Sequence, residues 1–290
     1  MTQAVLSREG RFRADDGKEI FYRCWAPPEP RAVILLAHGL AEHSGRYAGF
    51  ADFLVAAGIA VYAPDHPGHG RSAGMRGHIA HFSEFTGAIL QLAEIARQEH
   101  PARPLVLFGH SMGGLIAADL LLQQQSAFVA AVLTGAAIQS PQRPSRIALS
   151  INKLLSAIAP RSGVLRLNAS GISRDPQVVS DYENDPLVYR GKATSGFVAA
   201  MIAAMRRVIE NAASIRLPIL IMHGGVDSLT AVAGSKLLYD TVGSRDKNLV
   251  IYEDLYHEIL NEPERKKVMG DILQWLDSRL KPFPQNRKEP

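Results

Sequence analysis

The sequence predicts an α/β fold, in which helices flank a mostly parallel central sheet. From about residue 31 onward, short apolar runs alternate with segments of helical periodicity, as in chains built from strand–helix units. The apolar runs are also nearly continuous, which is typical of strands buried on both faces. These two observations together indicate a parallel sheet covered by helices.

The first element is a hairpin at the edge of the predicted sheet. Residues 10–13 and 18–26 flank an Asp-Asp-Gly turn at residues 15–17, which favours two antiparallel strands. Six further strands are expected at residues 32–37, 59–63, 105–108, 129–133, 219–222 and 249–252. Helices are expected between or after them, at residues 47–57, 82–99, 112–124, 235–242 and 263–280.

One long connection interrupts this alternation. About eighty residues separate the strand that ends near Gly135 from the strand that begins at Ile219, and they contain no obvious strand. Apolar side chains at helical spacing occur over residues 147–158 and again from 194 to about 215. Two interpretations stay open: a helical subdomain packed on the core, and a lid whose spare apolar face binds a hydrocarbon chain. We assign residues 138–213 to this helical cap (lid) insertion and residues 1–137 and 214–290 to the core.

The composition is that of an ordinary globular protein, with 47% hydrophobic and 21% charged residues. The net charge of +4 is small and spread along the chain, so it gives no support for nucleic-acid binding. Residues 1–10 lack the apolar core of a secretory signal, and no apolar run approaches the roughly 20 residues of a membrane span. The single cysteine, Cys24, cannot form an internal disulfide, which fits a reducing compartment. We expect a cytoplasmic location and leave open peripheral contact between the cap and a membrane surface.

The clearest chemical signal is the pentapeptide Gly109-His110-Ser111-Met112-Gly113, which follows a predicted strand and opens a predicted helix. In that context G-x-S-x-G forms a nucleophile elbow, a tight turn that exposes a strained serine at the helix N-terminus. The motif therefore predicts an α/β-hydrolase fold with Ser111 as the nucleophile.

A serine hydroxyl becomes a good nucleophile only when a base takes its proton. In the α/β-hydrolase order, an acid and then a histidine follow the serine, at the ends of later strands. Asp227 follows the strand expected at 219–222, and His257 follows the strand expected at 249–252. We expect His257 to act as general base and acid, and Asp227 to orient it and stabilise its charged form.

Three neighbouring residues are weaker candidates for these roles. Asp254 precedes His257 closely but could reach it only if its loop folded back. His223 is expected to support the loop that bears Asp227, and His110 is expected to point away from the nucleophile and pack.

An oxyanion hole needs two backbone N–H groups aimed at the developing negative oxygen. The amide after the nucleophile, that of Met112, supplies one of them in this fold. The loop after the first parallel strand reads Ala37-His38-Gly39-Leu40, and the residue after the His-Gly pair is expected to supply the second, so we assign Leu40.

A second polar cluster allows a metal interpretation. Asp65, His66 and His69 lie close together, with His78 and His81 further on, and such side chains can bind zinc. The alternative is a tight loop at Gly68 and Gly70, in which Asp65 and His66 form hydrogen bonds. We favour the loop, and we expect no metal and no cofactor.

Six segments together resemble the monoacylglycerol lipase (monoglyceride lipase) family of α/β-hydrolases, from about residue 10 to 280. They read HGLAEHSGRY from His38, DHPGHGRS from Asp65, GHSMGG from Gly109, NDPL from Asn184, HGGVD from His223 and YHE from Tyr256. The block with Glu-His-Ser-Gly-Arg-Tyr is more specific than the elbow, which many hydrolases share.

The resemblance implies a cap inserted after the sixth strand and cleavage of one acyl chain from glycerol. It implies that the cap is a lid, an acyl tunnel and a membrane-docking surface. Glu42 and Arg46 match positions near the polar end of the site, and Tyr182 matches a cap tyrosine near the glycerol hydroxyls. Glu42 and Arg46 have an alternative role, which is to brace the oxyanion loop. The segment after His257 lacks a second histidine that some family members have.

We therefore expect a serine hydrolase that cleaves fatty-acyl esters through an acyl-serine intermediate, with a monoacylglycerol as the substrate. A lysophospholipase or a broad carboxylesterase is the alternative enzyme. A hydrolase-fold binding protein without catalysis is the alternative outside enzymes, and such proteins commonly lack one member of the triad. The oligomeric state is not predicted.

Overall fold

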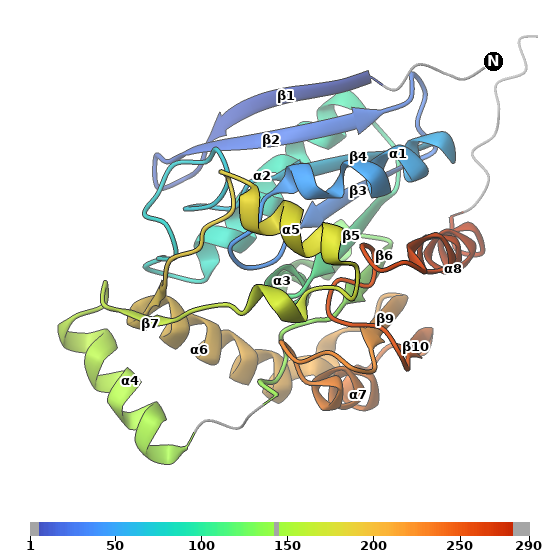
Figure 1. Ribbon diagram of the computed structural model, residues 1–290. Helices are drawn as coiled ribbons and strands as arrows, with labels where there is room; N and C mark the ends of the chain where they lie inside the picture. Colours follow the sequence, from blue (N-terminus) through green and yellow to red (C-terminus); the bar gives the residue numbers. More distant parts are fainter. Residues whose placement is uncertain (1–5, 142–144, 281–290) are drawn as a thin grey trace, which may run out of the picture.

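A computed structural model describes residues 6–141 and 145–280 (Figure 1). Its centre is an eight-stranded sheet with the order β1-β2-β4-β3-β5-β6-β9-β10. Strand β2 pairs antiparallel with β1 and β4, and all other neighbours in this sheet are parallel. The strands are β1 (Leu6–Arg13), β2 (Glu19–Ala26), β3 (Ala32–Ala37), β4 (Ile59–Pro64), β5 (Leu105–His110), β6 (Ala130–Thr134), β9 (Ile219–Gly224) and β10 (Lys247–Tyr252). The predicted fold class is confirmed.

Helices cover both faces of this sheet. Successive residues of a strand point to opposite faces, so alternate residues pack against different helices. The helices outside the insertion are α1 (Ala48–Ala56), α2 (Ser83–Glu99), α3 (Met112–Gln124), α7 (Val232–Thr241) and α8 (Arg265–Asp277). Val33 and Leu35 of β3 belong to the apolar cluster formed with α2 and α3, whereas Ile34 and Leu36 belong to the cluster formed with α1 and α8. All four side chains are fully buried.

Most of the predicted elements are present, with ends that differ by a few residues. Strand β3 and helix α3 have the predicted bounds, and the hairpin strand β1 begins four residues earlier than predicted. The prediction of burial on both faces is wrong for β10, where five of six residues are half-buried and one is exposed. The reason is its place at the edge of the sheet, which leaves one side without a neighbouring strand. Residues 1–5, part of the segment predicted to lack a secretory signal, lie outside the described residues.

The insertion lies between β6 and β9, after the sixth strand. Its elements are α4 (Arg146–Ile158), β7 (Gly163–Leu165), α5 (Pro176–Asn184), β8 (Ala193–Thr194) and α6 (Ser195–Asn211). The two predicted helical segments are α4 and α6. The expectation of no strand is wrong, because β7 and β8 pair antiparallel, in two strands too short to show a sequence period. Four 3₁₀ turns complete the described structure, at Ser44–Tyr47, Gln125–Ala127, Ala169–Gly171 and Ala212–Ser214.

The two long helices of the insertion have different surroundings. The side chains of Phe197, Met201 and Val208 on α6 are buried in the same apolar cluster as α3, so this helix is part of the core packing. Helix α4 packs on α6 and lies at the periphery of the molecule (Figure 1). The division at residues 138 and 213 remains a prediction. Within the described residues, no helix is long and apolar enough to cross a membrane.

Asp119 of α3 anchors α6 through a buried carboxylate. Arg207 donates to both oxygens of Asp119 at 3.0 Å, and the Asp119 side chain is 5% exposed. The Arg207→Met substitution leaves this carboxylate without its ion pair, so we expect it to lower the free energy of unfolding by about 2 kcal/mol in urea denaturation. Arg206→Met is the matched control on the same helix. Its side chain is 78% exposed, so its loss should lower that free energy by less than about 0.5 kcal/mol. Equal losses would show that the pair does not anchor α6.

Candidate active site

Ser111 lies at the turn between β5 and α3, in a backbone conformation that few side chains adopt. Its φ is 56° and its ψ is −118°, and it is one of three non-glycine residues with positive φ among the described residues. The amide of Ser111 donates to the carbonyl of Thr134 at 2.9 Å, and its own carbonyl accepts from Leu115 and Ala137. These backbone bonds hold the strained turn in place.

The elbow packs directly on the end of β3. A Cβ atom added at Gly113 would lie 2.0 Å from the carbonyl oxygen of Ala37, so only glycine allows this approach. A Cβ added at Gly39 would lie 3.3 Å from the Ser111 Cβ. The glycines therefore bring the serine next to the loop that was predicted to complete the oxyanion hole.

The structure brings Asp227 and His257 together, although they come from the loops after β9 and β10. Oδ2 of Asp227 lies 2.6 Å from Nδ1 of His257, and both side chains are buried. Among the described residues, no hydrogen bond involves Nε2 of His257, so this nitrogen is available to accept a proton. Asp254 is exposed on the turn before His257 and makes no such contact.

The carboxylate of Asp227 is held by four further donors. Oδ1 accepts from the amides of Leu229 and Thr230 at 2.7 and 3.0 Å. Oδ2 accepts from the Thr230 hydroxyl at 2.8 Å and contacts Nε2 of His223 at 3.0 Å. Burial alone would raise the pKa of Asp227, but the hydrogen bonds from His223 and His257 outweigh it and hold the pKa far below its ordinary value. Asp227 is therefore ionised, and His223 supports it as expected.

Gly135 and His110 lie against the ring of His257. Gly135, with φ 52°, follows β6, and a Cβ there would lie 3.2 Å from the imidazole. The ring of His110 lies 4.7 Å from that of His257, and its Nδ1 is 3.0 Å from the Thr134 hydroxyl. Burial, with the nearby charge of His257, lowers the pKa of His110 to about 4, so it packs as a neutral ring. The packing role expected for His110 is confirmed.

In the loop after β3, both the amide and the carbonyl of Gly39 form hydrogen bonds with side chains. The Gly39 amide donates to Oε1 of Glu42 at 2.5 Å, and the Gly39 carbonyl lies 2.8 Å from Nδ1 of His38. Nε2 of His38 accepts from the amide of His66 at 2.9 Å, so its proton is on Nδ1 and is donated to Gly39. The carbonyl of Gly39 and the amide of Leu40 belong to one planar peptide, so these bonds also set the direction of the Leu40 N–H. Within the described residues, this N–H forms no backbone hydrogen bond.

Arg46 joins the oxyanion loop to the residue after His257. Its guanidinium donates to Glu258 through two nitrogens, at 2.6 and 2.8 Å, and to Oε2 of Glu42 at 2.7 Å. Oε1 of Glu42 also accepts from the Tyr47 hydroxyl at 2.7 Å. Burial alone would raise the pKa of Glu258, but Arg46 outweighs it and lowers that pKa. The contacts of Glu42 and Arg46 are thus with protein groups, as the bracing role requires, and their substrate-binding role remains a prediction.

The insertion contacts the same loop at three points. Tyr182 of α5 is buried, and its ring lies 4.8 Å from the Arg46 guanidinium. Nε2 of His43 lies 2.8 Å from Oδ2 of Asp185, and the amide of Tyr189 donates to the carbonyl of Ala41 at 2.8 Å. The segment around α5 is therefore part of the wall of the site.

Of the residues considered for a metal, Asp65 forms the hydrogen bonds expected in the loop, whereas neither ring nitrogen of His66 has a hydrogen-bond partner among the described residues, so the expectation of side-chain hydrogen bonds from His66 is wrong. Asp65 accepts from the Ser44 amide at 2.9 Å and from the Arg71 amide at 2.8 Å, so its carboxylate stabilises the loop. His66 and His69 are buried beside Phe85, with ring distances of 5.3 and 6.2 Å. Burial lowers the pKa of His69 to about 3. Among residues 6–141 and 145–280, no group of three or more His, Cys, Asp or Glu side chains is arranged to hold a metal ion.

Sequence reasoning missed three residues that shape the site. The sequence motif contains Glu258 but does not show that its carboxylate pairs with Arg46. Thr230 donates a hydrogen bond to Asp227. Gly135 underlies His257. The sequence contains one signal for Glu258, its position directly after the predicted catalytic histidine. An acid that is buried there needs a cation as its partner. The sequence does not show that this cation is Arg46.

This arrangement has the parts that acyl transfer requires. A strained serine lies at a helix N-terminus, an ionised carboxylate holds an imidazole, and two amides are predicted to face the reacting carbonyl.

Comparison with known proteins gives consistent results. A family model described as "Serine aminopeptidase, S33" matches residues 28–264. The chain is 42% identical to a monoacylglycerol lipase of Mycolicibacterium smegmatis, over 94% of this chain and 98% of that protein. It is 33% identical to the human monoglyceride lipase, over 91% and 88%. The crystal structure of a monoacylglycerol lipase from Paleococcus ferrophilus superposes with a TM-score of 0.80, at 29% identity over 95% and 99%.

The strain at Ser111 predicts an unusual order of stability. Ser111→Gly should be more stable than Ser111→Ala by about 1 kcal/mol, because glycine adopts positive φ without steric cost. Ser150 on the exposed side of α4 is the control, and there the glycine variant should be less stable than the alanine variant by about 1 kcal/mol. Urea unfolding of the four variants measures both differences. The same order at both positions would mean that Ser111 is not strained.

Proposed function

This chain belongs to the serine aminopeptidase S33 family and, within it, to the monoacylglycerol lipases, and from that membership we propose that it hydrolyses a monoacylglycerol to a fatty acid and glycerol. Ser111 attacks the ester carbonyl while His257 takes its proton, and His257 then returns a proton to the glycerol oxygen as it leaves. Water activated by His257 cleaves the acyl-serine in the second half of the reaction. The amides of Leu40 and Met112 bind the negative oxygen in both halves.

One observation carries this proposal, the buried bond of 2.6 Å between Asp227 and His257. It holds the proton of His257 on Nδ1 and leaves Nε2 as the base. A hydrolase-fold binding protein would have no need for an ionised carboxylate with five contacts in a buried loop. The pair therefore supports an enzyme.

The choice of a fatty-acyl substrate is supported by the insertion. Each buried CH₂ group of an acyl chain contributes about 0.8 kcal/mol, so an apolar lid can supply much of the binding energy. The proposed boundaries of this lid are residues 138 and 213. We keep Tyr182 as the candidate contact to the glycerol part, with Glu42 and Arg46 as its neighbours.

We also propose that the insertion contacts membrane surfaces peripherally. Four side chains spaced along one face of α4, Ile147, Ile151, Leu154 and Ile158, are between 53% and 73% exposed. A helix of a globular protein normally turns such a face to the core. Contact with a lipid surface would cover this apolar face, and it would also place the protein at the membrane that contains its lipid substrate. The cytoplasmic location remains a prediction.

The catalytic assignment predicts selective losses of activity. Ser111→Ala should abolish labelling by a fluorophosphonate probe, and Asp227→Asn should lower kcat by about 10³-fold or more. The matched control, Asp254→Asn, removes an exposed carboxylate near His257 and should leave kcat within about twofold.

The proposed substrate predicts a dependence on acyl length and on the head group. Turnover of monoacylglycerols by the wild type should rise with acyl length. It should also exceed the turnover of the lysophosphatidylcholine with the same acyl chain.

Three results would contradict this proposal. Equal losses in the two aspartate variants would contradict the assigned triad. A preference for lysophosphatidylcholine would indicate the alternative lysophospholipase. Equal turnover of short and long chains would indicate a broad carboxylesterase.

A further inference from the structure

The outer part of the insertion combines an apolar face with an excess of cations. From residue 145 to residue 174 the chain has no acidic residue, and three exposed basic side chains of this stretch, Lys153, Arg161 and Arg166, form no ion pair among the described residues. The four exposed apolar side chains of α4 described above belong to the same stretch of chain. Val164 and Leu165 of β7 also belong to it, and they are 40% and 48% exposed. Apolar side chains flanked by cations, without acids, are typical of surfaces that bind anionic membranes.

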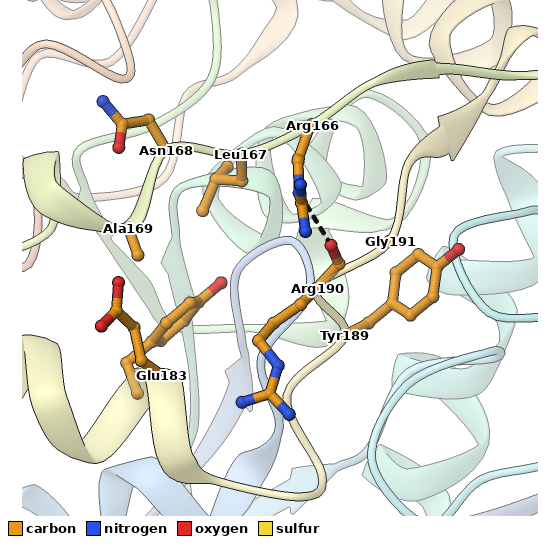
Figure 2. A pocket seen from close by; sticks show the side chains of 9 residues that line it. Arg166, Leu167, Asn168, Ala169, Glu183, Tyr189, Arg190 and Gly191 are labelled. Atoms are coloured by element: carbon orange, nitrogen blue, oxygen red, sulfur yellow. Dashed lines mark hydrogen bonds between the residues drawn. The ribbon is translucent and has the colours of Figure 1, made fainter.

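A cavity of about 400 Å³ opens next to β7 (Figure 2). Arg166 follows Leu165 directly, and Arg190 lies across from it, in the segment that leads to β8. Nε of Arg166 donates to the carbonyl of Arg190 at 2.9 Å, which brings the two residues together. Both residues line the cavity, and neither guanidinium forms an ion pair among the described residues. Many other arginines of this chain are paired with a carboxylate, as Arg174 is with Glu262.

The opposite wall of the cavity holds a carboxylate and an aromatic ring. Glu183 and Tyr182 of α5 line it, and Tyr182 also contacts Arg46 at 4.8 Å. Tyr182 is therefore shared by this cavity and the candidate active site. Two unpaired arginines suit a phosphate group. Glu183 suits a hydroxyl that donates a hydrogen bond, because an ionised carboxylate is an acceptor.

We propose that this cavity is a headgroup site for anionic phospholipids, so that the insertion docks preferentially on anionic bilayers. The phosphate binds between Arg166 and Arg190, and the hydroxyls of a glycerol headgroup donate to Glu183. The exposed apolar side chains of α4 and β7 lie in the acyl region of the same leaflet. This inference rests on the peripheral membrane contact proposed above and adds the class of lipid.

A second copy of this chain fits the same surface poorly. A symmetric dimer through α4 would bring the exposed cations Lys153, Arg161 and Arg166 of one copy close to the same side chains of the other. An anionic bilayer supplies both the apolar layer and the opposite charge. The charge of the patch therefore favours lipid over self-association.

The test is cosedimentation with two kinds of vesicle, neutral phosphatidylcholine alone and phosphatidylcholine mixed with phosphatidylglycerol. The wild type should bind the mixed vesicles at least tenfold more strongly. The double variant Arg166→Gln/Arg190→Gln should lose about thirtyfold of its affinity for mixed vesicles, since each cation near an anionic surface contributes about a factor of five. The matched control is Arg216→Gln/Arg245→Gln, which removes two exposed arginines outside the insertion and should change binding by less than about threefold.

The apolar face has its own pair of variants. Ile151→Gln/Leu154→Gln should weaken binding to both vesicles at least tenfold, whereas Val129→Gln, at an exposed position before β6, should not. Wild-type turnover of a soluble monoacylglycerol reports the proposed function separately, so a failure of docking would not be confused with a failure of catalysis.

Three outcomes would overturn the inference. Equal binding of the wild type to both vesicles would remove the anionic preference. Unchanged binding of the Arg166/Arg190 variant would exclude the cavity as the headgroup site. A change of molecular mass on glutamine substitution in α4, without a change in vesicle binding, would identify the face as an interface between copies.

Discussion

A buried cation between two carboxylates organises the active site. Arg46 pairs with Glu42, which holds the amide of Gly39, and with Glu258, which directly follows His257. A buried charge without a partner is strongly destabilising, so the loss of Arg46 would leave both carboxylates unpaired. The oxyanion loop and the loop of the base are therefore held in one geometry, and Tyr182 of the insertion packs on the same guanidinium.

The parallel sheet explains why such distant segments meet. The loops after β3, β5, β6, β9 and β10 all leave the carboxyl edge, because these strands run in the same direction. Each loop carries one part of the candidate site: the Leu40 amide predicted for the oxyanion hole, Ser111, Gly135, Asp227 and His257. The strain of Ser111 is sustained by the fully buried strands on either side of β5.

Much of this was predictable from local patterns, and the rest depended on contacts between distant residues. The elbow and the order of its partners follow from short motifs, β3 follows from a continuous apolar run, and α3 follows from its helical periodicity. Strands β7 and β8 are too short to have a period, and the exposure of β10 follows from its place at the sheet edge. The pairing of Arg46 with Glu258 joins residues 212 positions apart, and no local pattern reports it. Helix α5 was missed, although Asp175 and Pro176 are a normal cap and first residue.

The role of Arg46 is tested most directly by comparing two esters of the same fatty acid, the monoacylglycerol and the methyl ester, on the wild type and on Arg46→Lys. Lysine keeps the charge but cannot bind Glu258 with two nitrogens while it also holds Glu42. If Arg46 braces the catalytic loops, kcat should fall at least tenfold, and by the same factor for both esters. A loss confined to the monoacylglycerol, with the methyl ester unaffected, would contradict this account and show that Arg46 binds the glycerol hydroxyls.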